Sequence, residues 1–189
     1  MKKNIKVLTL TVCLILLVTA LSGCSKQDPN APSGYKTASN ETVDYYLYVP
    51  QDWVVDTVDG SQLTAARVSE YDQSNISMMA YVDDGGEFSS VDEYFESYKS
   101  TLSSVFDKTA GENGGEKSSF ELVSDESCLM GGAAANKYVY TATLGGVELK
   151  YMQVIALRGH TFYIFTYTAY AGSYDEDPVN GIIDNIVFK

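Results

Sequence analysis

The sequence predicts an α+β fold in which a mostly antiparallel β-sheet carries two helices. Apolar and aromatic segments of strand length recur along the chain, and short glycine-containing turns join the last three of them. Only two segments show the three-to-four-residue apolar spacing of an amphipathic helix. Strands joined by such short turns must be antiparallel neighbours. Helices that are separate from a sheet of this kind define the α+β class.

Three strands are predicted before the first helix. They cover residues 43–49, 62–68 and 76–82, which are rich in β-branched and aromatic side chains. Pro50 follows the first of these segments, and the Asp-Asp-Gly-Gly run at 83–86 ends the third.

The first helix is predicted to begin at Ser90, which has the capping-box spacing to Glu93. Apolar residues then recur at helical spacing and form one stripe: Val91, Tyr94, Phe95, Tyr98, Leu102, Val105 and Phe106. The glycine-rich segment 107–117 breaks this pattern and is predicted to be a loop.

Four strands and a helix are predicted in the second half of the chain. The strands cover 120–127, 135–144, 147–157 and 161–169, and the last three should form an antiparallel meander. The second helix should begin at Asp177-Pro178, because proline is favoured at the first helical position. Its apolar stripe comprises Val179, Ile182, Ile183 and Ile186.

The N-terminal segment has the pattern of an export signal. A cationic start is followed by the apolar block 7–20, which is shorter than the about 20 residues of a membrane span. The sequence Leu21-Ser22-Gly23-Cys24 resembles the lipobox of bacterial lipoproteins. The resemblance implies a signal peptide at 1–23, cleavage before Cys24, and acyl groups such as palmitate on Cys24. An uncleaved signal anchor is the alternative. The predicted location is the cell membrane, on its extracytoplasmic face.

A tether and one domain are predicted after the lipid anchor. Residues 24–40 have no aliphatic side chain larger than alanine, so the sequence predicts a flexible segment there and a single domain at 41–189. Cleavage before Cys24 leaves 10 basic residues against 25 acidic ones, a formal net charge of −15. An acidic surface of this kind repels the phosphate backbone, so we predict no nucleic-acid partner.

Several segments resemble the PsbP-like domain. They are YYLYVPQDW, NISMMAYV, SSVDEYFESY, GGAAANKYVYT, QVIALRGHTFYIFTYTA and IIDNIVF. This superfamily includes photosystem II extrinsic subunits, a Ran-binding protein and many bacterial lipoproteins. The resemblance implies an α/β/α sandwich, with the antiparallel sheet between helices, and a binding or assembly role. It carries no catalytic residues.

Residues that could carry chemistry are few. Cys128 is the one cysteine left outside the leader and Cys24, and beside Leu129 it is expected to be a small buried hydrophobe. His160 is the only histidine and is expected in a solvated turn. Asp83, Asp84 and Glu87 are weak calcium candidates, because their spacing does not match a calcium-binding loop. We therefore predict no cofactor, no metal and no enzymatic activity.

The 15 tyrosines are the most unusual feature of the composition. Those on predicted strands are expected to be mainly core residues, whereas an exposed set would form a surface for a protein or glycan partner. They are Tyr45, Tyr46, Tyr48, Tyr138, Tyr140, Tyr163, Tyr167 and Tyr170. The predicted function is a membrane-anchored, non-enzymatic binding or accessory module. The alternatives are a carboxylate-based hydrolase of cell-wall glycan and a small solute-binding lipoprotein.

Overall fold

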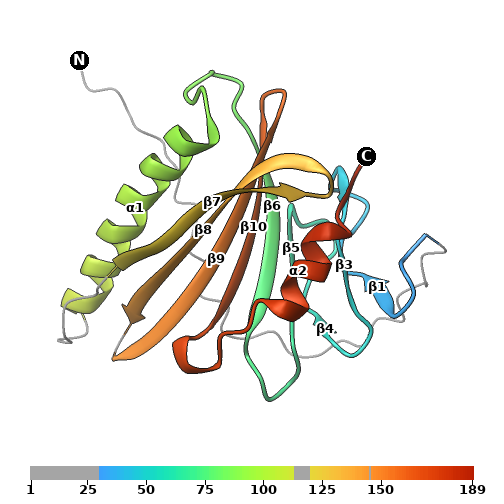
Figure 1. Cartoon of the computed structure of the whole chain (residues 1–189), viewed down its shortest axis with the longest axis horizontal. Coiled ribbons are helices and arrows are strands. Elements are labelled where there is room, and N and C mark those ends of the chain that lie inside the picture. Colours follow the sequence, from blue (N-terminus) through green and yellow to red (C-terminus); the bar gives the residue numbers. More distant parts are fainter. Residues whose placement is uncertain (1–29, 113–119, 145) are drawn as a thin grey trace.

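One seven-stranded sheet forms the centre of the computed structural model, which describes residues 30–112, 120–144 and 146–189 (Figure 1). All neighbouring strands in this sheet are antiparallel, in the order β4-β5-β6-β10-β9-β8-β7. The strands are β4 (Val54–Val55), β5 (Leu63–Arg67), β6 (Asn75–Val82), β7 (Phe120–Met130), β8 (Ala133–Leu144), β9 (Val147–Arg158) and β10 (Thr161–Tyr170). The predicted antiparallel meander is therefore confirmed as β8-β9-β10.

Helices lie on both faces of this sheet, as the α/β/α sandwich requires. On one face, the helix α1 (Val91–Glu112) packs mainly on β8 and also on β9. The other face is covered by α2 (Asp177–Asp184) together with two small sheets, β1-β3 and β2-β11. Their strands are β1 (Tyr35–Thr37), β2 (Tyr45–Tyr46), β3 (Tyr48–Pro50) and β11 (Val187–Phe188); the short helix η1 (Ala171–Ser173) links β10 to α2.

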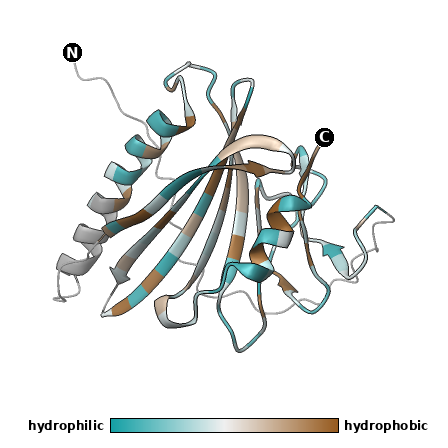
Figure 2. Ribbon diagram, in the orientation of Figure 1, coloured by the Kyte–Doolittle hydropathy of each residue, from teal (hydrophilic) through white to brown (hydrophobic). Residues whose placement is uncertain are grey.

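The two faces carry separate hydrophobic clusters. Under α1 the cluster is largely aromatic, and Phe95 stacks on Tyr138 with 3.6 Å between ring centroids. Under α2 it is mainly aliphatic and includes the predicted stripe Val179, Ile182, Ile183 and Ile186, all of which are buried. Figure 2 shows apolar and polar residues on different sides of α2. Each helix thus buries apolar stripe residues on the sheet, as the spacing predicts. In α1 these are Tyr94, Phe95 and Leu102; the side chains of Val105 and Phe106 lie outside the described part of the chain.

The start of α1 is capped nearly as predicted. The Ser90 Oγ accepts a hydrogen bond from the Glu93 N–H at 3.1 Å. The Glu93 carboxylate accepts from the Ser89 N–H and Oγ, at 2.9 and 2.7 Å, and so reaches one residue further back than a standard capping box. In the same turn, the Asp92 Oδ1 accepts hydrogen bonds from Tyr138 and Asn136 at 2.6 and 2.7 Å, which attach the helix to β8.

Three predictions about local structure were wrong. The helix α1 continues to Glu112, so residues 107–112 are helical and not part of a loop. Helix continuation requires backbone hydrogen bonds and not an apolar stripe, and one glycine costs only about 1 kcal/mol. The predicted strand 43–49 is divided into β2 and β3, because these two strands pair with different partners, β11 and β1.

The third error concerns the predicted tether. Residues 35–37 form β1, and Ala38 is buried, so the folded part begins earlier than residue 41. Backbone pairing of β1 with β3 orders this segment without aliphatic side chains, which is why its composition was misleading. The signal peptide and Cys24 lie outside the described residues. Within the described ranges, no helix is long and apolar enough to cross a membrane.

Candidate functional site

The acidic turn after β6 is held together by its own backbone. The Asp83 carboxylate accepts hydrogen bonds from the Glu87 and Phe88 N–H groups, at 3.0 and 2.9 Å. These bonds lower the pKa of Asp83. Asp84 and Glu87 are exposed. Nowhere in the described ranges do three or more His, Cys, Asp or Glu residues form a group that could hold a metal ion.

The other candidates for chemistry lie apart from one another. Cys128 on β7 packs against the core under α2, and burial raises the pKa of its thiol. A raised pKa leaves less thiolate, so the residue is a weak nucleophile. The sequence predicts a buried hydrophobe here, and the structure shows Cys128 half-buried. His160 is exposed in the β9–β10 turn. In the acidic run 175–177, the Asp175 Oδ1 accepts from the Asp177 N–H at 3.1 Å at the start of α2.

Most tyrosines belong to the core. Of the eight on predicted strands, Tyr46 is half-buried, Tyr170 is exposed, and six are buried: Tyr45, Tyr48, Tyr138, Tyr140, Tyr163 and Tyr167. Burial raises the pKa of Tyr163 to about 12, and its hydroxyl donates to Asp44 at 2.6 Å. All 15 tyrosines lie in the described ranges, and only Tyr71 and Tyr170 are exposed, by 95% and 52%. A tyrosine surface can therefore involve only these two.

A polar area lies on the α1 side of the sheet, over strands that α1 does not mainly cover. We call it the polar face and define it as Arg67, Asn75, Ser77, Thr166 and Thr168. Strand alternation puts Ser77 and Thr166 on the same side as Met79 and Ile164, which belong to the aromatic cluster under α1.

The strand register places these residues next to one another as two adjacent sets of cross-strand neighbours. Arg67 pairs with Asn75, which pairs with Thr168; Ser77 pairs with Thr166. All five side chains are half-buried. The hydroxyl side chains of Ser77, Thr166 and Thr168 therefore form the centre of the polar face, and the Arg67 guanidinium lies at its β5 edge.

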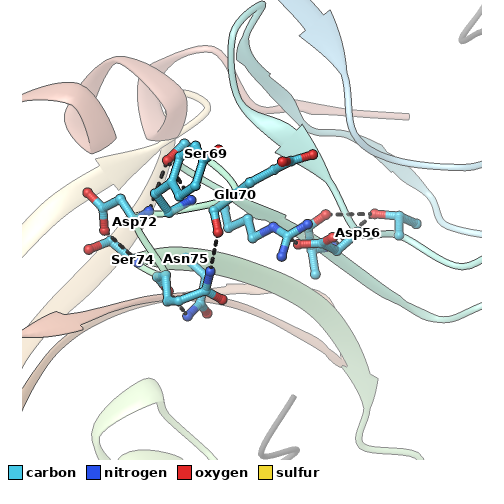
Figure 3. A network of polar contacts seen from close by, with 11 residues as sticks. Asp56, Ser69, Glu70, Asp72, Ser74 and Asn75 are labelled. Atoms are coloured by element: carbon cyan, nitrogen blue, oxygen red, sulfur yellow. Dashed lines mark hydrogen bonds and ion pairs between the residues drawn. The ribbon is translucent and has the colours of Figure 1, made fainter. Parts of the chain in front are cut away.

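The Arg67 guanidinium, the cation of the polar face, lacks part of its hydrogen bonding. The Arg67 Nε lies 3.4 Å from the Asp56 Oδ2, in an ion pair whose side chains are 22% and 16% exposed (Figure 3). The Arg67 Nε is nevertheless buried and donates no hydrogen bond to any described residue. Burial raises the pKa of Asp56, and the charge of Arg67 opposes this shift. A buried donor without an acceptor is unusual in a native protein.

A second unsatisfied polar atom lies next to the same face. Gln153 on β9 pairs with Thr166 and is only 1% exposed. Its Nε2 donates to the Thr166 Oγ1 at 3.3 Å, so the amide group reaches toward the polar face. Its Oε1 accepts no hydrogen bond, but the Gln153 side chain also lies within hydrogen-bond reach of the Tyr98 hydroxyl on α1, so the amide is covered by that helix. The two buried side-chain polar atoms that lack partners in the described part of the chain thus border one area.

The turn between β5 and β6 closes one end of the polar face. The Ser69 Oγ accepts from the Tyr71 and Asp72 N–H groups, and the Asp72 Oδ1 accepts from the Ser74 N–H, which holds the turn in shape (Figure 3). Tyr71 lies in this turn and is exposed. Alternation along β10 puts Tyr170 on the side of Thr168, at the same end of the sheet. Both exposed tyrosines therefore lie near this end of the polar face.

Sequence reasoning missed this area. It did not single out Arg67, Gln153 or Tyr71. A usable signal was a cation at the end of a strand that is otherwise uncharged and mostly buried, because a charge in such a position needs a nearby partner. The partner and the free atoms depend on strand register, which the sequence does not reveal.

Comparisons with known proteins extend the description of the fold. No protein-family model matches the chain, and no curated protein matches it. The solution structure of cyanobacterial PsbP from Synechocystis sp. PCC 6803 is similar, with a TM-score of 0.54 and 12% identity over 86% of this chain and 96% of that one.

Two further solved structures are more distant. A putative regulator of unknown function from Pseudomonas aeruginosa has a TM-score of 0.49 at 14% identity, over 82% of this chain and 97% of that one. LpqN of Mycobacterium tuberculosis, described as involved in cell envelope biogenesis, has a TM-score of 0.44 at 13% identity, over 77% and 83%. The likeness to cyanobacterial PsbP, together with the antiparallel sheet between helices, shows that this chain has the PsbP-like fold.

Proposed function

We propose that this protein is a non-enzymatic binding or accessory module, held on the extracytoplasmic face of the cell membrane by a lipid on Cys24. The Leu21-Ser22-Gly23-Cys24 sequence after a short apolar block is the observation that carries the proposal. Two acyl chains anchor a protein stably, because each buried methylene contributes about 0.8 kcal/mol. The folded domain would then face the extracytoplasmic space, with its acidic surface in solution.

The positions of the reactive groups support a binding role. The thiol of Cys128 has a raised pKa, and the Asp83 carboxylate holds a turn in place. His160 lies in an exposed turn at the other end of β10 from Tyr170. A nucleophile and its base need to be within hydrogen-bond reach of each other. The polar face, in contrast, offers half-buried hydroxyl, amide and guanidinium groups, which suits ligand binding.

Lipidation is tested by growing the expressing bacterium with an alkyne-labelled fatty acid. We expect label on the wild-type protein and on Cys128→Ser, but none on Cys24→Ser. Mass spectrometry of the mature N-terminal peptide should place the lipid on Cys24, with residues 1–23 absent. An unlabelled wild-type protein, or one that retains its leader, would show that the anchoring proposal is wrong.

A hydrolase acting on cell-wall glycan is the alternative function, and one observation favours it. Burial raises the pKa of the Asp56 carboxyl, as is common for a general acid. A glycosidase also needs a second carboxylate at about 5–9.5 Å. Release of new reducing ends from purified cell wall, lost in Asp56→Asn, would establish this activity and refute the non-enzymatic proposal.

A further inference from the structure

The strand β7 forms a long outer edge of the seven-stranded sheet. Its backbone pairs with β8 on one side, and no other described strand pairs with it. Residues 121–127 are all exposed, so this part of the strand is covered on neither face. The opposite edge strand, β4, has only two residues. Proteins usually shorten or cover such an edge, because its unpaired backbone groups can pair with another chain.

The turn that follows β7 defines which backbone groups face outward. Gly131 and Gly132 have φ values of +53° and +79°, as in a two-residue type I′ hairpin turn. Met130 and Ala133 flank this turn and therefore form a hydrogen-bonded pair. Hydrogen-bonded and non-hydrogen-bonded pairs alternate along antiparallel strands. The residues whose N–H and C=O groups point away from β8 are therefore Asp125, Ser127 and Leu129.

The β7 edge is acidic. Glu121 and Asp125 are exposed and form no ion pair within the described residues. Glu126 pairs with Lys137 at 2.6 Å, but Lys137 also pairs with Glu176 at 3.2 Å, so negative charge remains in excess there. The strand itself contains no lysine or arginine. Charge complementarity therefore favours a basic partner at this edge.

A second copy of the chain fits the β7 edge poorly. Two antiparallel β7 strands would bring Glu121, Asp125 and Glu126 of each copy into one ribbon without a basic residue. Like charges at opposite cross-strand positions are destabilising. The chain also carries 25 acidic residues against 13 basic ones, so two copies repel each other. The bulge at Val123, where the register with β8 shifts, adds a twist that opposes pairing of two such edges.

We propose that the β7 edge binds an extended segment of a partner protein, rich in lysine or arginine, as an additional strand of the sheet. The inference rests on the proposed function, because it names the partner class of the same binding module. The outward backbone groups of Asp125, Ser127 and Leu129 exchange hydrogen bonds with the segment. Its basic side chains pair with Asp125 and Glu121. In strand addition of this kind, main-chain hydrogen bonds supply affinity and side chains supply specificity.

The test measures peptide binding to the complete mature protein in a neutral detergent, by fluorescence anisotropy. The probe is a fluorescein-labelled peptide of nine residues in which lysine and threonine alternate. Two further peptides of the same length serve as controls. A glutamate-threonine peptide has the opposite charge, and a lysine-threonine peptide with every backbone nitrogen methylated keeps the charge but has no N–H donors. We expect both control peptides to bind at least about tenfold more weakly than the probe.

Variants of the protein separate the effect of charge from that of the backbone. Asp125→Lys should weaken binding about fivefold to tenfold, because a favourable cross-strand pair becomes a repulsive one. Glu70→Lys makes the same change of charge on the exposed turn between β5 and β6 and should stay within about twofold of the wild type. Ser127→Pro removes one outward N–H, which an edge strand tolerates, and should weaken binding about fivefold. Ser127→Ala keeps that N–H and should bind as the wild type does.

Each outcome decides for or against strand addition. Absence of probe binding, or equal binding of the N-methylated peptide, would overturn the inference; a lipid on Cys24 in the same sample would leave the anchored module intact. Equal losses in Asp125→Lys and Glu70→Lys would also overturn it, since they would indicate unspecific attraction. Dimerisation in sedimentation runs that Ser127→Pro abolishes would assign the edge to a second copy instead. Slower hydrogen exchange of the 125–129 amides with the probe bound would support the proposal. Thermal unfolding of each variant is measured in parallel, so that a loss of affinity is accepted only for folded protein.

Discussion

The turn between β7 and β8 offers a stringent test of how α2 is held on the sheet. Gly131 has a φ of +53°, and its N–H donates to the Ile183 carbonyl oxygen at 3.0 Å. A Cβ at this position would lie 2.3 Å from the Ile186 carbonyl oxygen. Both contacts are with the backbone at the end of α2, which cannot move without displacing buried Ile183 and Ile186.

The substitution Gly131→Ala should therefore cost far more than a change of backbone preference. The positive φ alone costs an alanine about 1–2 kcal/mol. The overlap must also push the turn and α2 apart, which weakens a backbone hydrogen bond of about 1 kcal/mol. Partial exposure of two isoleucines adds a further 1–2 kcal/mol, since full burial of each contributes about 1.5–3 kcal/mol. We expect a total loss of about 4 kcal/mol.

Gly132→Ala is the matched control. Gly132 has a φ of +79°, but a Cβ there would have no atom within 4 Å. Its cost should therefore be limited to about 1–2 kcal/mol. Urea unfolding can be followed by the fluorescence of Trp53, the only tryptophan, which is buried. Equal free energies of unfolding for the two variants, within about 0.5 kcal/mol, would refute this account of the turn.

Three further predictions test separate features. Tyr138→Phe removes the hydrogen bond to Asp92 and should lower the free energy of unfolding by about 1 kcal/mol; an unchanged urea midpoint would show that this bond does not hold α1 on β8. Asp83 has a lowered pKa in the folded protein, so its stabilising effect is complete above the unfolded pKa and disappears as pH falls through the folded pKa. Asp83→Asn should therefore be less stable than wild type at pH 7, with the difference shrinking in acid; a constant difference in thermal midpoint would contradict this. Cys128 should react with a disulfide reagent more slowly at pH 7 than the same thiol in urea, because burial raises its pKa; equal rates would refute its burial.

The fold class and most of the elements follow from the amino-acid sequence alone. Strand alternation and helical spacing correctly predicted β5, β6, the β8-β9-β10 meander and both helices, because these elements bury their own apolar stripes. The prediction that most strand tyrosines are core residues was also correct. The lipid anchor at Cys24 remains a prediction from the sequence, since it lies outside the described residues.

Which residues form the candidate site depends on the three-dimensional arrangement of the strands. Arg67 and Gln153 are 86 positions apart in the chain and border the same area only because β5, β6, β10 and β9 are neighbours in this register. The edge strands β1 and β11 escaped prediction for a related reason. They are ordered by backbone pairing with distant segments, not by a local apolar pattern. Local spacing reports what a segment buries, whereas long-range pairing decides which side chains meet and which polar atoms are left without a partner.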